Sequence, residues 1–242
     1  MINKIKNIII KKNLDGYIVP KNDKFFTEYS KVSNLELVSN FSGSAGFAII
    51  LRKKNYLFVD GRYTIQAKKQ SGKNFKIFEI PFIWPRNIFI SSKNRLNIGF
   101  DPKLFTYSSL KYYFHNTCDL SPISEDLFYK KNFKNININK FYKLDEKIVG
   151  ESSKSKINRV IKILNKKKID YMFISAGENV CWLMNIRGKD LPNSPVANCN
   201  IILTKKGKIY FFSELEKISK IKKTLINQNV IFKEEKKLFE IL

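Results

Sequence analysis

The chain carries one pattern twice. Residues 11–19 (KKNLDGYIV) recur as residues 166–174 (KKKIDYMFI), and residues 48–54 (AIILRKK) recur as residues 200–206 (NIILTKK). Both pairs lie about 150 residues apart, and each lysine-rich stretch follows apolar residues at helical spacing. A repeat that keeps its order and spacing predicts a duplicated unit of helix, polar turn, buried strand and hairpin. We therefore expect two domains with one topology.

The two copies differ in length. The first copy continues well past its hairpin, whereas the second reaches Leu242 at a point that corresponds to about Ile90 of the first. We expect one domain at residues 1–145 and a second, incomplete domain at residues 150–242. The polar segment 124–150, with its lysine-rich stretch at 130–143, should form an irregular connection between them.

An incomplete second sheet has a physical consequence. We expect the second domain to lack the strand equivalent to residues 96–100 of the first. The strand beside that gap should then expose unpaired backbone groups and apolar side chains. The second domain should be the less stable half of the chain.

Strands alternate with helices along the first copy. The expected strands lie at residues 17–19, 47–51, 56–59, 75–80 and 96–100, and the expected helices at residues 2–12, 61–70, 83–91 and 107–116. Asp60 stands directly before a predicted helix, where its carboxylate can cap the helix start. Alternation with a clear hairpin indicates the α/β class, in which each domain is a mixed β-sheet flanked by helices.

The charge of the chain does not identify a partner. A net charge of +24 would suit nucleic acid, but only six of the 45 basic residues are arginines and the lysines are scattered through every segment. The accompanying excess of Asn, Ile, Phe and Tyr is typical of an AT-rich genome. We expect weak, salt-dependent binding to polyanions and no specific nucleic-acid site.

The apolar segments and cysteines indicate the compartment. No apolar run has the length of a membrane span, and the first ten residues carry lysines without a cleavage site, so we expect no membrane association and a cytoplasmic location. Cys118, Cys181 and Cys199 are an odd number without CxxC spacing. Buried thiols in a reducing compartment are the simplest interpretation.

Motifs in both copies resemble one protein family. Three motifs of the first copy resemble, in order and spacing, the amino-terminal domain of the three-domain Xaa-Pro aminopeptidases (aminopeptidase P) of the creatinase/prolidase group: residues 15–20 (DGYIVP), 41–46 (FSGSAG) and 59–67 (VDGRYTIQA). Three motifs of the second copy resemble the second domain of that family: residues 150–153 (GESS), 182–190 (WLMNIRGKD) and 193–196 (NSPV). Together they span nearly the whole chain.

The resemblance implies two creatinase N-terminal-like domains in tandem, the second truncated. In that family a third domain hydrolyses the bond before proline with two metal ions, usually manganese, held by two Asp, one His and two Glu. That catalytic domain would follow Leu242. The resemblance thus implies that the missing catalytic domain, and a peptide with proline at its second position, are partners in the full enzyme, which can be a homodimer.

The residues themselves also argue against catalysis by this chain alone. A dinuclear hydrolase needs several carboxylates and usually a histidine that converge on two cations. The single histidine, His115, follows a predicted helix, where a structural or surface role is the simpler interpretation. Phosphate-loop, nucleophile-elbow and dinucleotide motifs are absent from the sequence. We predict no catalytic residue and no metal ligand.

Arg62 is the candidate substrate-binding residue. The resemblance implies that this arginine faces the catalytic domain at the substrate end of the cleft. A planar guanidinium suits a carboxylate or a peptide carbonyl there. A local ion pair with Asp60 or Asp101 is the alternative, and the two roles are compatible.

Trp182, Arg187 and Gly188 are candidates for the interface to the missing domain. They can form a packing and turn motif at that face, or belong to the core, where a tryptophan among apolar neighbours is common.

Two classes of function remain open. One is the non-catalytic part of a Xaa-Pro aminopeptidase, present as a fragment or as a split or interrupted gene, which shapes the cleft and aids assembly. The other is a stand-alone binding module that has lost the peptidase domain. An end inside the second copy favours the first, because a module that folds alone should end at a domain boundary.

Overall fold

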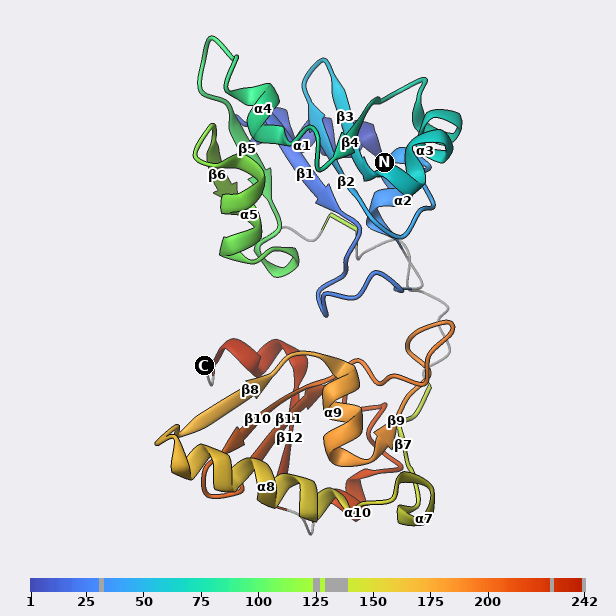
Figure 1. Cartoon of the computed structure of the whole chain (residues 1–242), viewed down its shortest axis with the longest axis vertical. Helices are drawn as coiled ribbons and strands as arrows, with labels where there is room; N and C mark the ends of the chain where they lie inside the picture. Colours follow the sequence, from blue (N-terminus) through green and yellow to red (C-terminus); the bar gives the residue numbers. More distant parts are fainter. Residues whose placement is uncertain (31–32, 124–126, 129–138, 227–228, 241–242) are drawn as a thin grey trace. The chain divides into compact units, whose positions relative to one another are not determined.

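The predicted alternation of strands and helices is present in the computed structural model, which describes residues 1–30, 33–123, 127–128, 139–226 and 229–240 (Figure 1). The chain divides into two compact units, Met1–Lys134 and Asn135–Leu242. Each unit is a mixed β-sheet flanked by helices, which confirms the predicted fold class.

The sheet of the first unit has six strands in the order β4-β3-β2-β1-β5-β6. They are β1 (Gly16–Pro20), β2 (Phe47–Leu51), β3 (Asn55–Asp60), β4 (Lys76–Ile80), β5 (Asn97–Phe100) and β6 (Asp119–Pro122). The pairs β1–β2 and β2–β3 are antiparallel, and the other neighbours are parallel. Strand β1 is therefore central, and all five of its residues are buried.

Helices cover both faces of this sheet. They are α1 (Ile2–Lys11), α2 (Asn34–Ser39), η1 (Gly61–Tyr63), α3 (Thr64–Ser71), α4 (Pro85–Phe89), η2 (Pro102–Leu104) and α5 (Tyr107–Phe114). Helices α1, α2 and α3 contribute to one apolar cluster, with Ile5 and Ile9 of α1 fully buried at helical spacing. Helices α4 and α5 contribute Phe89 and Phe114 to the cluster on the opposite face.

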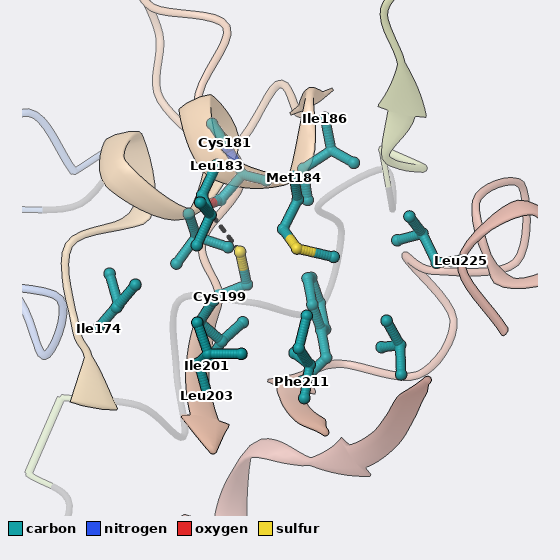
Figure 2. Close-up of a cluster of buried hydrophobic side chains, with 14 of the residues drawn as sticks. Ile174, Cys181, Leu183, Met184, Ile186, Cys199, Ile201, Leu203, Phe211 and Leu225 are labelled. Atoms are coloured by element: carbon teal, nitrogen blue, oxygen red, sulfur yellow. Dashed lines mark hydrogen bonds between the residues drawn. The ribbon is translucent and has the colours of Figure 1, made fainter. Parts of the chain in front are cut away.

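The sheet of the second unit has four strands in the order β12-β11-β10-β8. They are β8 (Tyr171–Ile174), β10 (Asn200–Thr204), β11 (Ile209–Ser213) and β12 (Val230–Glu234), and a separate ribbon pairs β7 (Tyr142–Lys143) with β9 (Ile186–Arg187). The helices are α7 (Glu146–Val149), α8 (Ser153–Lys166), α9 (Gly177–Met184), α10 (Lys222–Ile226) and η3 (Glu235–Glu240). Figure 2 shows Met184 of α9 pointing toward Phe211, and Cys181, Cys199 and Ile201 belong to the same buried cluster.

The two sheets share one topology over four strands. Strands β8, β10, β11 and β12 have the same order and relative directions as β1, β2, β3 and β4. The repeated strand and hairpin that the sequence predicts are thus present in both units. The sheets differ beyond the first strand, because β1 pairs with β5 whereas β8 is the edge strand of the sheet formed by the described residues.

The expected irregular connection at residues 124–150 is wrong in its last part. Tyr142 pairs with Arg187, and Glu146–Val149 form helix α7, capped by Asp145. A fully buried Phe141 holds this segment against the second unit. Residues 124–126 and 129–138, with most of the lysine-rich stretch 130–143, lie outside the described residues.

Candidate functional site

Arg62 lies in the turn that follows β3. Its backbone N–H donates to Asp60 Oδ1 at 3.0 Å, so Asp60 caps the turn as predicted. Its side chain donates from Nε to Oδ1 at 3.1 Å and from Nη2 to Oδ2 at 2.6 Å. The predicted alternative of a local pair with Asp60 is therefore present, whereas Asp101 caps η2 through Lys103.

The ion pair is exposed and charged. The Arg62 side chain has 71% of its surface exposed, and its guanidinium lies 5.2 Å from the centre of the Tyr63 ring. The hydrogen bonds from Arg62 hold the pKa of Asp60 below its usual value, and Asp60 in turn raises the pKa of Arg62. Both groups are ionised at physiological pH, so the pair carries no net charge and its exposed guanidinium offers hydrogen-bond donors.

The loop of small residues lies against this turn. The Ser44 and Tyr63 hydroxyls are 2.9 Å apart, and Ser42 Oγ accepts from both Gln66 and Gln70. At Gly46, with φ of +145°, a Cβ would lie 2.5 Å from Phe58 O, so only glycine fits. Two motifs that carry the family resemblance thus form one polar surface.

Sequence reasoning missed two residues near this surface. Glu28 raises the pKa of Tyr29 through a side-chain hydrogen bond and also contributes to the raised pKa of Arg62. The Tyr29 side chain is exposed. Glu28 and Tyr29 precede the loop at residues 41–46, and no pattern in the sequence connects them with Arg62.

The second group of candidates surrounds the end of α9. Trp182 is 52% exposed, so it is not a core residue. Arg187 Nη1 donates to the backbone oxygens of Cys181 and Ile186 at 3.1 and 2.8 Å. A Cβ on Gly188 would lie 2.7 Å from Ala197 Cα, so the glycine allows the chain to approach closely. Arg187 and Gly188 therefore hold the turn, and Trp182 is the member of the three that is available at the surface.

A buried lysine supports the same turn. Lys156 is 3% exposed, and its ammonium donates to Trp182 O at 2.8 Å and to Asn185 Oδ1 at 2.7 Å. It lies 4.5 Å from the centre of the Trp182 ring. Burial lowers the pKa of Lys156, because desolvation penalises the ammonium. The positive charge at the carboxyl end of α9 complements the helix dipole.

A signal for Lys156 was present in the sequence. It stands four residues before Val160 and eight before Leu164, on the apolar stripe of α8. From the sequence alone, this lysine counts only among the scattered lysines and has no assigned role. Lys156 is buried because the carboxyl end of α9 packs on it, and the sequence alone does not predict this contact.

The titratable groups provide no metal centre in the described part of the chain, where no three His, Cys, Asp or Glu side chains lie close enough to hold an ion. His115 ends α5 with φ of 43° and is exposed. Burial raises the pKa of the Cys118 thiol to about 12, and it also raises the pKa of Cys181 and Cys199. These thiols are protonated at neutral pH and are poor nucleophiles. Among the described helices, none is long and apolar enough to cross a bilayer.

Both halves match a known domain. Residues 1–127 match the creatinase/prolidase N-terminal domain family, and residues 134–242 match a second family of the same description. The chain belongs to the creatinase/prolidase N-terminal domain family. The resemblance inferred from the motifs is thereby confirmed.

Similar proteins carry aminopeptidase names. The chain is 30% identical over 226 residues to a probable Xaa-Pro aminopeptidase P of Coprinopsis cinerea, which covers 87% of the chain and 36% of the relative. It is 26% identical to Xaa-Pro aminopeptidase 1 of Dictyostelium discoideum, over 100% of the chain and 42% of the relative. The creatinase-type chain thus spans about two fifths of these relatives.

A solved structure has the same fold. The X-prolyl aminopeptidase of Caenorhabditis elegans, described as a cytosolic enzyme with a di-nuclear active site, superposes with a TM-score of 0.85 at 23% identity. The match covers 94% of this chain and 39% of the solved one. At this identity the likeness supports the fold alone.

Proposed function

We propose that the chain is the non-catalytic amino-terminal portion of a Xaa-Pro aminopeptidase, an enzyme that removes an N-terminal residue preceding proline. The observation that carries this proposal is the match of both halves, in order, to creatinase/prolidase N-terminal domains, together with relatives named for this activity. The chain contributes to the shape of the substrate cleft and to assembly with the catalytic domain.

The catalytic metal ions of such an enzyme do not fit the described residues. A dinuclear centre needs a group of carboxylates and histidine, and no cluster of three such side chains exists in the described ranges. Two manganese ions would therefore bind to protein outside the described residues. The chain supplies binding and positioning groups, and we assign it no step of bond cleavage.

Arg62 is the residue that we propose to contact the substrate. Asp60 holds Nε and Nη2 of the guanidinium, which fixes its plane. In the described part of the chain, Nη1 has no hydrogen-bond partner, so it can donate to a peptide carbonyl or carboxylate. We assign Trp182, supported by Arg187 and Gly188, to the face that packs on the catalytic domain.

A chimeric enzyme tests this proposal. The chain replaces the matching amino-terminal part of the Dictyostelium relative, and cleavage of a peptide beginning Arg-Pro-Pro is measured with manganese. We expect activity from the chimera and none from residues 1–242 alone. An inactive but folded chimera, or metal-dependent cleavage by the chain alone that His115→Ala abolishes, would contradict the proposal.

Substitutions in the chimera test Arg62. A charge-assisted hydrogen bond contributes about 1.5–3 kcal/mol, so Arg62→Ala should lower kcat/KM by roughly ten- to a hundredfold. Arg62→Lys should recover part of this loss, since an ammonium cannot make the planar contact. Arg52→Ala is the matched control, because Arg52 is also exposed and pairs with an aspartate, Asp15. Unchanged kinetics with a lowered melting temperature would assign Arg62 a structural role only.

A further inference from the structure

The fold of the second unit brings together two lysine-rich segments that are 40 residues apart in the sequence. Helix α8 ends at Lys166, and residues 205–208 form the turn between β10 and β11. Asn165 Nδ2 donates to Lys205 O at 3.1 Å, and a Cβ on Gly207 would lie 3.1 Å from Ile161 Cδ1. The end of α8 and this turn therefore lie against each other.

Six exposed or half-buried lysines stand on these two segments, and we refer to them as the lysine cluster: Lys166, Lys167, Lys168, Lys205, Lys206 and Lys208. Asp170 is the one acidic residue among residues 165–170 and 204–208, so the two segments carry a net charge of +5. Asp170 pairs with Lys205 at 2.7 Å. Within the described ranges, no carboxylate forms an ion pair with the other five lysines.

Lys168 occupies a backbone conformation that does not suit a lysine. It follows α8 in the left-handed region, with φ of 56°, where glycine and asparagine are preferred. Its counterpart in the repeat is an asparagine, Asn13, with φ of 51°. Asparagine belongs to the same AT-rich set of residues as lysine, so base composition does not account for the exchange. The strained lysine points to a use of its charge outside the fold.

The helix dipole accounts for only part of the lysine cluster. Lysines in the last turn of α8 complement the partial negative charge at the carboxyl end of that helix. Lys206 and Lys208 lie in a β-hairpin, where this effect is absent, and like charges that are held together repel one another. Such a cluster is unfavourable in the free protein and becomes favourable beside an anion that carries several charges.

Nucleic-acid phosphates suit this cluster better than a bilayer. A duplex carries one negative charge per about 1.7 Å of its axis, and lysines bind phosphates as flexible point charges. A helix that lies on a membrane needs a free apolar face beside its lysines. Ile157 and Leu164, on the apolar face of α8, are instead buried in the core of the second unit.

We propose that the lysine cluster binds the phosphate backbone of duplex nucleic acid without reading its bases. Contacts to phosphates carry no sequence information, so this binding agrees with the absence of a specific nucleic-acid site that the sequence predicts. The cluster gives the salt-dependent polyanion binding expected from the sequence a defined location. The inference goes beyond the proposed function and does not depend on it.

A binding experiment with the 242-residue chain tests the proposal. Fluorescence anisotropy measures binding to two labelled DNA duplexes of about 20 base pairs and unrelated sequence, at several salt concentrations. We expect the two affinities to agree within about twofold. The logarithm of the binding constant should fall with the logarithm of the salt concentration, with a slope of about −4 to −5, because each contacted phosphate adds about −0.9.

Two double variants of equal charge locate the site. Lys166→Glu with Lys206→Glu changes the cluster, whereas Lys69→Glu with Lys111→Glu changes exposed lysines of the first unit. Each exchange removes two charges, so both double variants carry +20 instead of +24. The cluster variant should bind roughly tenfold or more weakly, with a slope smaller by about 2, and the control variant should lose less than about threefold. Circular dichroism checks that both are folded.

Lys168→Asn tests the strained position directly. It should raise the unfolding midpoint of the second unit, because asparagine suits the left-handed conformation, and it should weaken duplex binding by roughly twofold or more. Three results would overturn the proposal: no duplex binding at low salt, equal weakening by the two double variants, or tighter binding to vesicles that contain phosphatidylserine than to either duplex.

Discussion

Replacement of Asn185 by alanine should destabilise the second unit strongly. Asn185 ends α9 in the left-handed conformation, with φ of 54°, and its side chain is 1% exposed. Its Oδ1 accepts from the buried Lys156 ammonium at 2.7 Å, and its Nδ2 donates to Glu151 O at 2.8 Å. One side chain therefore connects α9 with the start of α8.

The expected loss has two sources. Alanine in the left-handed region costs about 1–2 kcal/mol. The lost hydrogen bond to the ammonium contributes about 1.5–3 kcal/mol and the neutral one about 1 kcal/mol. Allowing for partial compensation by water, Asn185→Ala should lower the free energy of unfolding of the second unit by about 3–5 kcal/mol. Asn185→Gly accepts the backbone conformation, so it should lose about 1 kcal/mol less.

Urea unfolding read out by hydrogen exchange of peptides from α8 and α9 measures this quantity for the second unit alone. Asn229→Ala is the matched control, because Asn229 also has a positive φ, of 61°, but is exposed. Asn229→Ala should lose only the part of the free energy of unfolding that comes from the left-handed backbone conformation. If Asn185→Ala costs no more than Asn229→Ala, the buried hydrogen bonds of Asn185 do not stabilise the turn.

Three further outcomes are expected. Gly188→Ala should destabilise the second unit by about 1–3 kcal/mol in the same assay, since the new Cβ would meet the Ala197 backbone, and an unchanged midpoint would refute this packing. The free energy of unfolding of the first unit should fall between pH 9 and about 12, because burial raises the pKa of Cys118 and only the unfolded state loses the thiol proton in this range. Cys118→Ala should reduce this loss of stability, and a pH profile identical to that of the unchanged chain would contradict the prediction. Amides of β8 should exchange faster than those of β1, and the second unit should be less protected overall; equal protection would mean that the exposed edge has no energetic consequence.

Much of the fold could be predicted because it follows from local patterns of apolar and turn-forming residues. The central strands of both units are apolar runs bounded by turns, and the hairpins follow from lysine-rich turns between such runs. Strand β6 escaped prediction because its sequence is DLSP, with one aliphatic residue, and it forms by pairing with β5. Strand β7 has two residues, and its partner Arg187 is distant in sequence. Non-local pairing leaves no periodic signal in so short a segment.

The short-range contacts of the candidate site could be predicted from the sequence, whereas its tertiary contacts could not. Asp60 and Arg62 are two residues apart, so a cap and an ion pair follow from short-range geometry. The exposure of Trp182 did not follow, because its neighbours in sequence are apolar and only the packing of α9 decides which of them face the sheet. The loop containing Ser42 and Ser44 could be recognised as a motif, but its contact with the Arg62 turn is tertiary.

The second repeat helps to distinguish a functional role of Arg62 from a structural one. The equivalent turn after β11 in the second unit carries Lys217, whose ammonium pairs with Asp190 at 3.1 Å and with Glu214 at 3.2 Å. The Lys217 and Asp190 side chains are only 14% and 7% exposed, and Asp190 also accepts from Asn198 N, so this pair ties loops together. Burial alone would lower the pKa of Lys217, but Asp190 and Glu214 raise it above its usual value.

In the first unit the pair at this turn faces solvent, with the Arg62 side chain 71% exposed. Exposed ion pairs contribute little to stability, and Asp60 can cap the turn through the backbone N–H of residue 62 whatever side chain stands there. The fold therefore does not require an arginine at residue 62, whereas we expect the buried pair of Lys217, four residues after the end of β11, to stabilise the second unit. Arg62→Ala and Lys217→Ala should accordingly behave differently in the isolated chain, with the midpoint of the first unit unchanged and that of the second lowered. A loss of stability from Arg62→Ala as large as that from Lys217→Ala would show that both turns are structural, and would remove the reason to place Arg62 at a substrate.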